Sequence, residues 1–399
     1  MLRGGRFDED MDRAAEEYQT SLESDVRIFD PVVQINIAHV QMLEKENIID
    51  ESSAEEIKNA LIELQDKGIE ELDLRPDLED IHMVIEEYVK KETGEETGGK
   101  LHTAKSRNDQ VTTAIRMYLR DEILEIQKLT AEVIEAIIDL AEENTETIMP
   151  GYTHLQVAEP TTFGHYLCSY GENFFRDLER LNHSYEQVNQ CPLGACALAG
   201  TSFPIDRELT SDLLGFDKVL ENTIDATGSR DYVLQVMSDL SILMTNLSRL
   251  CEEISIWSSA EFGMLEIPDE FSSTSSIMPQ KKNPVVAELE RAKTGRTIGN
   301  LTGGLTIMKT LTQAYNLDLQ ELTPLLWDSI DQVKPTMQVM KKHVEKLKPK
   351  PENMLENTKK GYATMTELAN TLVRETEIPF RTAHKIVGKL VSQAISEEK

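Results

Sequence analysis

Serine and lysine side chains gather in residues 272–284, SSTSSIMPQKKNP, which contain no histidine, cysteine or acidic residue. A serine hydroxyl is a poor base in free solution and acts as one only where cations or a helix N-terminus stabilise its alkoxide. Lys281, Lys282 and a helix that opens at Pro284 would supply both. Composition leaves three interpretations open: a mobile loop that closes over substrate with a serine base, a serine–lysine acyl-transfer pair, and a flexible surface loop.

Two other polar clusters precede this segment. Residues 101–110, LHTAKSRNDQ, hold a dense set of donors suited to binding carboxylates, although a polar loop that caps the following helix would have a similar composition. Residues 149–162, MPGYTHLQVAEPTT, place Thr153 and His154 between Pro-Gly and Glu-Pro turn pairs. A lone histidine is more often structural than catalytic, but the polar company of this one keeps a catalytic role open.

The sequence gives little support for a nucleotide-binding site or a metal site. Residues 94–100, GEETGGK, match the spacing of a phosphate-binding loop, but a helical segment precedes them and Leu101 replaces the magnesium-binding hydroxyl. The spacing of Cys191 and Cys196 is poor for zinc, and four cysteines in a chain of 399 residues make no disulfide framework. We therefore expect no bound metal and reduced cysteines that serve packing.

The balance of charge restricts the partners. The chain has 71 acidic and 41 basic residues, and its net charge of −30 repels nucleic acid backbones. An anionic substrate would need locally clustered lysine and arginine. No apolar run reaches the roughly 18 residues that span a bilayer, and the N-terminus shows no secretory or transit signal. We expect a cytoplasmic protein that binds neither nucleic acid nor membrane.

Long helices must position the polar clusters. Apolar residues recur at three- and four-residue spacings over residues 120–146 and 231–257. A third helix is expected over residues 284–312, with Asn283 as its N-cap and Pro284 at its first position. Alternating strand patterns are nearly absent, so the chain is predicted to be all-α with a bundle of long helices. Apolar residues on more than one helix face indicate oligomerisation.

Two breaks interrupt the helical pattern. A glycine-rich polar stretch covers residues 94–109, and two closely spaced prolines lie within residues 347–354. Three regions are predicted: an N-terminal helical domain at 1–105, a central long-helix bundle at 106–350, and a small C-terminal helical domain at 351–399.

The three polar clusters, in this order on an all-α chain, resemble the fumarase and aspartase superfamily. Its closing motif, Gly-Ser-Ser-x-Met-Pro-x-Lys-x-Asn-Pro, is met from Ser275 to Pro284, with Thr274 in place of the glycine. Within the superfamily the chain resembles the argininosuccinate lyase family over nearly its whole length. The segments that carry this resemblance are GGRF at 4–7, KLHTAKSRNDQV at 100–111, GYTHLQ at 151–156, FSSTSSIMPQKKNP at 271–284, AYNLDLQE at 314–321 and GYATMTELA at 361–369.

This resemblance implies a three-region fumarase/aspartase-like fold and a homotetramer around a core of long helices, with active sites shared between subunits. The implied reaction is the reversible β-elimination of the small molecule argininosuccinate to L-arginine and fumarate, the last step of arginine biosynthesis. It would require no metal or organic cofactor.

The resemblance also implies residue roles. Ser275 would act as the base, and Lys281 would stabilise the aci-carboxylate carbanion. His154, paired with Glu288, would protonate the leaving nitrogen directly or through water. The positions implied for substrate binding are Ser21, Arg107, Asn108, Thr153, Arg230, Asn283, Tyr315 and Gln320.

The chain departs from the family pattern in places. Leu317 and Thr323 stand where members commonly carry basic residues, and Val285 stands in place of aspartate after the Asn-Pro pair. We therefore expect altered substrate contacts but unchanged elimination chemistry. The chain is shorter than typical members, so we expect an incomplete C-terminal domain.

Two alternatives to this function stay open. Another fumarate-releasing lyase, such as adenylosuccinate lyase, would share the superfamily motifs. Relatives of the family also serve as lens crystallins, so the fold can persist as an inactive structural protein. Retention of all four catalytic positions favours an enzyme.

Overall fold

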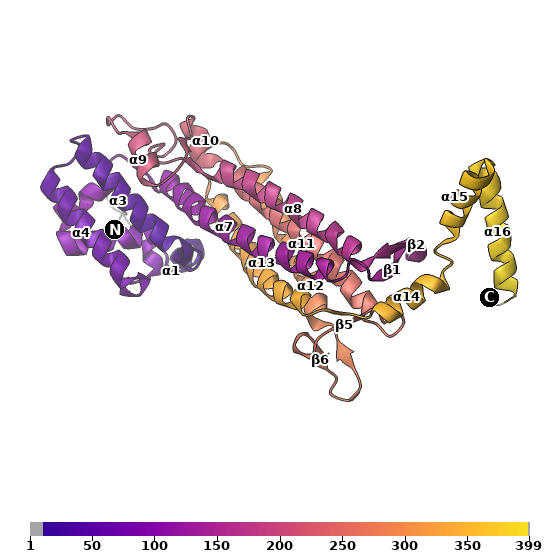
Figure 1. Cartoon of the computed structure of the whole chain (residues 1–399). Helices are drawn as coiled ribbons and strands as arrows, with labels where there is room; N and C mark the ends of the chain where they lie inside the picture. The colour runs from indigo at the N-terminus through magenta and orange to yellow at the C-terminus, as the bar shows by residue number, and fades with distance from the viewer. Residues whose placement is uncertain (1–10, 398–399) are drawn as a thin grey trace. The chain divides into compact units, whose positions relative to one another are not determined.

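Helices dominate the computed structural model, which describes residues 11–397 (Figure 1). The GGRF segment at 4–7 lies outside the described residues. The helices are α1 (Arg13–Gln19), α2 (Leu22–Asp25), α3 (Phe29–Lys45), α4 (Glu51–Lys67), α5 (Ile81–Thr93), α6 (Glu95–Gly98), α7 (Arg107–Glu142), α8 (Phe163–Val188), α9 (Arg207–Leu213), α10 (Thr223–Gly228), α11 (Asp231–Trp257), α12 (Val285–Met308), α13 (Leu322–Glu345), α14 (Pro351–Lys360), α15 (Met365–Thr376) and α16 (Phe380–Ser396). Short 3₁₀ helices are η1 (Val26–Ile28), η2 (Ile69–Glu71), η3 (Pro76–Leu78), η4 (Gly99–His102), η5 (Asp269–Phe271) and η6 (Leu317–Glu321).

Aspartate caps set the starts of helices near the N-terminus. Asp12, Asp50 and Asp80 precede α1, α4 and α5, and each side chain accepts a hydrogen bond from a backbone N–H of the first turn. The connection between α4 and α5 returns to the start of the chain, where the Ser21 N–H donates to the Glu79 carbonyl at 2.9 Å. These local signals therefore bring residues around Ser21 beside the entry to α5.

Five helices of the described chain, α7, α8, α11, α12 and α13, have 24 to 36 residues each. They bury apolar stripes at helical spacing, as in α7, where Ile123, Ile126 and Val133 are buried. Helix α11 has the bounds that periodicity predicts, residues 231–257. The prediction of an all-α chain built on long helices is confirmed.

The predicted bounds of one helix differ from the observed ones by one residue at the start and four at the end. Helix α12 covers Val285–Met308 rather than residues 284–312, and Asn283 does not cap it. Asn283 instead pairs with Ser273 in a short ladder, and its side-chain amide donates to the Ser273 hydroxyl at 3.3 Å. The helix begins at Val285, so Pro284 rather than Asn283 directly precedes it. Residues 120–146 likewise overrun α7, which ends at Glu142.

The strands of the described residues form short two-stranded sheets. The largest is the antiparallel hairpin of β1 (Ile148–Thr153) and β2 (Gln156–Thr162), and β3 (Gln190–Cys191) pairs in parallel with β4 (Lys218–Val219). Antiparallel pairs join β5 (Leu265–Glu266) to β8 (Lys348–Pro349) and β6 (Ser273–Thr274) to β7 (Lys282–Asn283). The turn-rich segment 149–162 is thus a β-hairpin.

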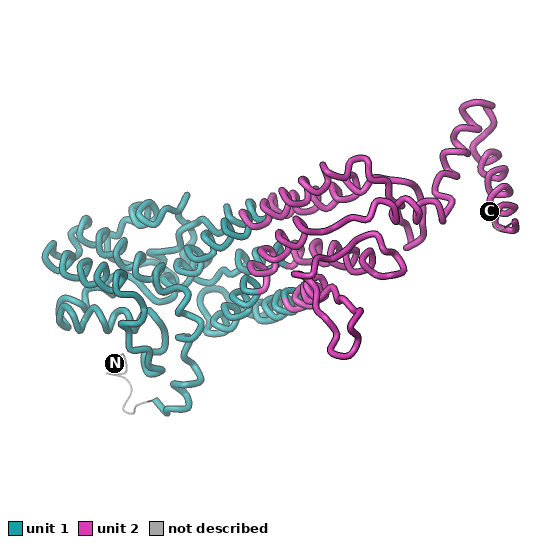
Figure 2. Tube along the Cα trace, turned by 60° about the horizontal axis from the view of Figure 1, so that its bottom comes forward, with its two compact units in different colours: residues 1–127, 180–240, 297–331 teal, residues 128–179, 241–296, 332–399 magenta. Residues whose placement is uncertain are grey.

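The chain divides into two compact units (Figure 2). Unit 1 comprises residues 1–127, 180–240 and 297–331, and unit 2 comprises residues 128–179, 241–296 and 332–399. Each of the five long helices contributes one part to each unit. The three-region division of the sequence stays a prediction.

The C-terminal helices α14, α15 and α16 belong to unit 2. Helices α15 and α16 pack through a small core of Ala369, Ala383 and Val387. Among the described helices, none is both long and apolar enough to cross a bilayer.

Candidate active site

A hollow of about 150 Å³ lies in unit 1. Residues from five separate stretches of sequence border it: the turn before α2, the entry to α5, the start of α7, the start of α11 and the segment that leads to α13. Six of the eight positions predicted to bind substrate line this hollow, namely Ser21, Arg107, Asn108, Arg230, Tyr315 and Gln320. The two departures from the family pattern, Leu317 and Thr323, line it as well.

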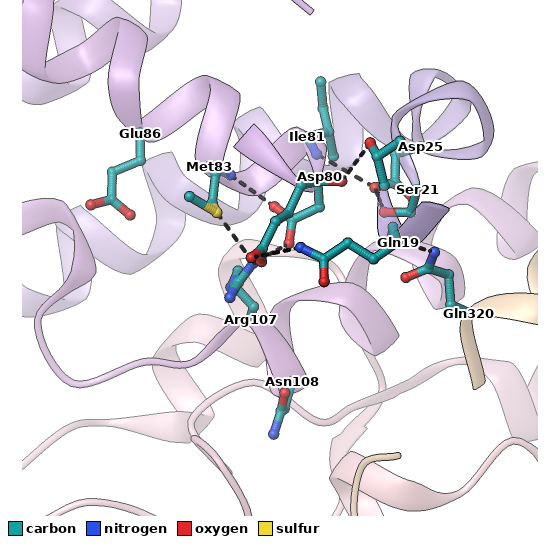
Figure 3. A network of polar contacts seen from close by, with 12 residues as sticks. Gln19, Ser21, Asp25, Asp80, Ile81, Met83, Glu86, Arg107, Asn108 and Gln320 are labelled. Atoms are coloured by element: carbon teal, nitrogen blue, oxygen red, sulfur yellow. Dashed lines mark hydrogen bonds and ion pairs between the residues drawn. The ribbon is translucent and has the colours of Figure 1, made fainter. Parts of the chain in front are cut away.

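One wall of the hollow is an ion-pair network centred on Arg107. Its Nη1 donates to Glu79 at 2.7 Å and to Asp80 at 2.8 Å, and Gln19 donates to Glu79 at 3.2 Å (Figure 3). Two carboxylates therefore match one guanidinium. The two ion pairs hold the Arg107 side chain in place. Because two carboxylates face one guanidinium, this wall carries an excess negative charge.

Asp25 adds a third carboxyl group to the same wall. It is buried, accepts a hydrogen bond from the Ser21 hydroxyl at 2.6 Å, and lies near the N–H of Ile81 at 3.4 Å (Figure 3). Burial, together with the nearby charge of Asp80, raises the pKa of Asp25 to about 7, although the hydrogen bonds from Ser21 and Ile81 oppose the shift. Asp25 can therefore exchange a proton near neutral pH.

Arg230 supplies a cation of a different kind. Its side chain is 2% exposed and donates to the carbonyls of Thr227 at 3.2 Å and Ser229 at 2.8 Å. Within the described residues no carboxylate pairs with it, and its Nε has no partner. A buried guanidinium without a counter-ion is costly, so an anionic group of a ligand would stabilise this arrangement. The hollow thus offers both an acidic wall and a cation.

The remaining lining residues hold the hollow together. Gln320 donates to the Gln19 carbonyl at 3.0 Å, and Asn108 donates to the Ala197 carbonyl at 3.1 Å. Burial raises the pKa of Tyr315 above its usual value, and the positive charge of Arg230 partly opposes this shift.

Buried Asp109 links the start of α7 to the segment around residues 194–196. Its carboxylate accepts hydrogen bonds from the N–H groups of Ser106 at 3.1 Å, Gly194 at 3.0 Å and Cys196 at 2.7 Å. Lys105 is buried and donates to Asn36. The polar cluster at 101–110 is therefore divided between residues that line the hollow and residues that support it.

Sequence reasoning missed several residues of the hollow, namely Gln19, Asp25, Glu79, Asp80 and His82. Asp25 lies four residues after Ser21, a spacing that places two side chains on one helix face and could have indicated the pair. Glu79 and Asp80 carry no comparable signal, because their role depends on Arg107, which lies 27 residues or more further along the chain.

The serine-rich segment forms a loop between β6 and β7 in unit 2. The hydroxyl oxygen of Ser275 accepts hydrogen bonds from the N–H groups of Ile277 at 3.3 Å and Met278 at 3.0 Å. Such N–H groups favour negative charge on an oxygen, which is what a serine alkoxide requires.

The two adjacent lysines of this loop have different surroundings. Lys282 forms an ion pair with Asp269 at 2.6 Å and donates to the Ile267 carbonyl at 2.8 Å, so it anchors the stem of the loop. Lys281 is exposed and makes no ion pair within the described residues. Its charge is therefore available to a ligand.

Thr153 and His154 lie at the tip of the β1–β2 hairpin. Thr153 pairs with Gln156, so His154 and Leu155 form a two-residue turn, and their φ angles are 54° and 57°. Tight hairpin turns of this kind need two positive φ angles and usually use asparagine or glycine. A histidine and a leucine in these conformations store strain, which concentrates at functional sites.

The catalytic candidates all belong to unit 2, whereas the hollow belongs to unit 1. Ser275 is half-buried, while Lys281, His154 and Glu288 are exposed. Within residues 11–397 no hydrogen bond or ion pair joins His154 to Glu288, so a single chain does not form the predicted pair. The same residues contain no group of three or more histidine, cysteine or acidic side chains that could hold a metal ion.

Comparison with known proteins first defines the class. A family model described as Lyase matches residues 5–299. The solved structure of a class II fumarase from Schistosoma mansoni aligns with 97% of this chain and 87% of its own, with a TM-score of 0.82 and 18% identity, which shows the fold alone. The chain is a lyase of the fumarase and aspartase superfamily and has its fumarase/aspartase-like fold.

Closer relatives define the family. An argininosuccinate lyase from Methanococcus aeolicus is 49% identical over 399 residues, which cover 100% of this chain and 82% of the relative. A second family model, Argininosuccinate lyase C-terminal, matches residues 362–399. A solved EDDS lyase variant with bound fumarate is 33% identical with a TM-score of 0.86, over 93% of this chain and 73% of its own. The chain belongs to the argininosuccinate lyase family, which confirms the resemblance drawn from its motifs.

Proposed function

We propose that this carbon–nitrogen lyase cleaves argininosuccinate to L-arginine and fumarate, reversibly and in the cytoplasm. The observation that carries the proposal is the match to an argininosuccinate lyase over the whole chain at 49% identity. The hollow of unit 1 adds chemical support, because argininosuccinate carries both cationic and anionic groups. The hollow presents carboxylates as well as Arg230, which pairs with no carboxylate of residues 11–397.

In the proposed reaction, the Ser275 alkoxide removes the proton from the carbon β to the leaving nitrogen. Lys281 stabilises the second negative charge that then develops on the adjacent carboxylate. The electron pair of the carbanion forms the double bond of fumarate, and the carbon–nitrogen bond breaks. The N–H groups of Ile277 and Met278 support the alkoxide, since both donate to the Ser275 oxygen.

His154, oriented by Glu288, would supply the proton that the departing guanidinium nitrogen takes up, directly or through water. We infer that this pair forms between chains of a homotetramer, because both side chains are exposed and no hydrogen bond or ion pair joins them within residues 11–397. Helix α12 supports assembly, since its apolar residues Leu289, Ile298 and Leu305 are exposed. Thr153 and Asn283 would contact substrate beside these groups.

The decisive experiment follows fumarate absorbance with purified protein and argininosuccinate. Ser275→Ala should lower kcat by on the order of 10²–10⁴-fold, and Lys281→Ala by on the order of 10²–10³-fold, because each removes a group that acts on the reacting carbon or its carboxylate. Ser276→Ala is the matched control, since it removes a neighbouring exposed hydroxyl and should leave kcat near its original value.

Competing substrates separate the alternatives. Turnover of adenylosuccinate alone, or of the substrate of EDDS lyase alone, would overturn the choice of argininosuccinate. An unchanged kcat in Ser275→Ala would overturn the assignment of the base. A folded protein that turns over none of these compounds would favour the structural role.

A further inference from the structure

Gly228, the last residue of α10, lies in direct contact with the backbone of the segment between α12 and η6. A Cβ at this position would lie 2.6 Å from the nitrogen, 2.7 Å from the oxygen and 2.8 Å from the Cα of Ala314. Real Cβ atoms essentially never approach other atoms within 3.0 Å. All three atoms belong to the backbone, so no side-chain rotation could relieve the clash.

The contact joins two parts of the substrate hollow. Arg230 donates to the carbonyls of Thr227 and Ser229, the residues on either side of Gly228. On the other face of the contact, Ala314 directly precedes Tyr315, which lines the hollow. The distance between these two lining residues therefore depends on how closely the two backbones approach.

The same contact borders a second hollow of unit 1. A second hollow of about 240 Å³ is bordered by Gly228 and Ala314, and Arg230 and Leu319 line both this space and the substrate hollow. A side chain at position 228 would push the two segments apart along this boundary. The wall of the substrate hollow would then move with Tyr315.

We infer that Gly228 is a positioning residue for substrate binding: the absence of a side chain there lets Ala314 dock and places Tyr315 opposite Arg230. This inference rests on the proposed function. Ala314 has a φ of 65°, so the docked segment is already held in a conformation that is unfavourable for alanine. The contact with Gly228 therefore decides where the segment lies.

Gly228→Ala tests the inference by its effect on KM and kcat. A displacement of about 1 Å in a binding group can cost on the order of 10²-fold in rate. We expect KM for argininosuccinate to rise at least about tenfold while kcat falls less, because the hollow is the proposed substrate-binding surface and none of the four catalytic candidates lines it. Gly99→Ala is the matched control, since a Cβ there meets nothing within 4 Å, and it should leave both constants unchanged.

A double-mutant cycle shows whether the effect passes through Tyr315. If it does, Gly228→Ala combined with Tyr315→Ala should lose no more kcat/KM than Tyr315→Ala alone. Losses that add would overturn the inference, as would an unchanged KM in the single variant. If Gly228→Ala fails to fold, Tyr315→Ala keeps the inference testable: it should raise KM, because the effect is inferred to act through Tyr315, and an unchanged KM would overturn the inference.

A crystal structure of Gly228→Ala supplies a test that needs no turnover. We expect Ala314 and Tyr315 to move away from Arg230, and an unchanged Tyr315 position would overturn the inference. Turnover by the unaltered enzyme decides the proposed function separately.

Discussion

At the scale of single residues, the charged side chains that line the hollow differ in whether a group of opposite charge pairs with them. Arg107 is neutralised by Glu79 and Asp80, whereas Arg230 is buried without a carboxylate in the described chain. The charge of Asp25 depends on pH, because burial brings the pKa of its carboxyl group to about 7. The protonation of Asp25 should therefore be visible in the stability of the protein.

Asp25→Asn should remove a pH dependence of stability. The pKa of Asp25 is raised from 3.8 to about 7, so the folded chain binds this proton more tightly than the unfolded chain does. The contribution is complete below the unfolded pKa and is lost as the pH rises through the folded one. The free energy of unfolding of the native protein, relative to Asp25→Asn, should fall by about 1 kcal/mol per pH unit between these values.

Urea unfolding of both proteins from pH 4.5 to 8 measures this difference. Asp30→Asn, which alters an exposed aspartate five residues away, is the control and should show no such slope. A difference that stays constant or grows with pH would contradict the assignment.

At the scale of elements, the β1–β2 hairpin presents its key residue through a strained turn. Thr153 and Gln156 pair across it, and the register leaves His154 and Leu155 with positive φ angles. Leu155 is 74% exposed, so it packs against little that could repay this conformation. The strain is then best explained by the fixed orientation that it gives to His154.

Leu155→Gly should raise stability and lower activity together. Glycine adopts positive φ without the cost of about 1 kcal/mol that other residues incur, so the free energy of unfolding should rise by up to about that amount. A more flexible turn should lower kcat, because His154 would no longer be held in one orientation. Thermal unfolding and the fumarate assay measure the two effects.

The same substitution in a helix gives the control. Leu124 is half exposed on α7, where Leu124→Gly should cost about 1 kcal/mol of stability because glycine is a poor helix former. A loss of stability in Leu155→Gly as large as in Leu124→Gly would argue against strain at the turn.

At the scale of the whole molecule, the candidate residues fall into two groups that belong to different units. The hollow occupies unit 1, and the serine-rich loop, the hairpin tip and Glu288 belong to unit 2. The exposed His154, Lys281 and Glu288, together with exposed apolar residues on α12, support the proposed homotetramer with shared sites.

Mixing inactive variants tests whether sites are shared. His154→Ala and Ser275→Ala should each be inactive, but chains mixed by dissociation and reassociation should recover activity that neither parent has, because some sites would then receive both intact groups. Ser275→Ala mixed with Lys281→Ala is the control: both changes lie on one loop, so no recovery is expected. Recovery in neither mixture, or a native mass other than that of a tetramer, would contradict the shared site.

The sequence by itself determined the features that depend on local chemistry. Helical periodicity predicted the bounds of α11, and the motifs predicted the family, whereas the catalytic roles stay predictions. These features were readable because helix formation and motif spacing depend on neighbours within a few turns of chain. The pairing of Asn283 with Ser273, ten residues away, was not predicted, because propensity alone does not register such a contact.

Only the tertiary structure decided which distant residues share a surface. Six predicted residues between Ser21 and Gln320 meet in one hollow, where Asp25 joins them and acquires its raised pKa. The same packing sets Gly228 against Ala314, a contact across 86 positions of sequence. Burial, pKa and backbone approach depend on which helix faces pack together, and that is a property of the folded chain as a whole.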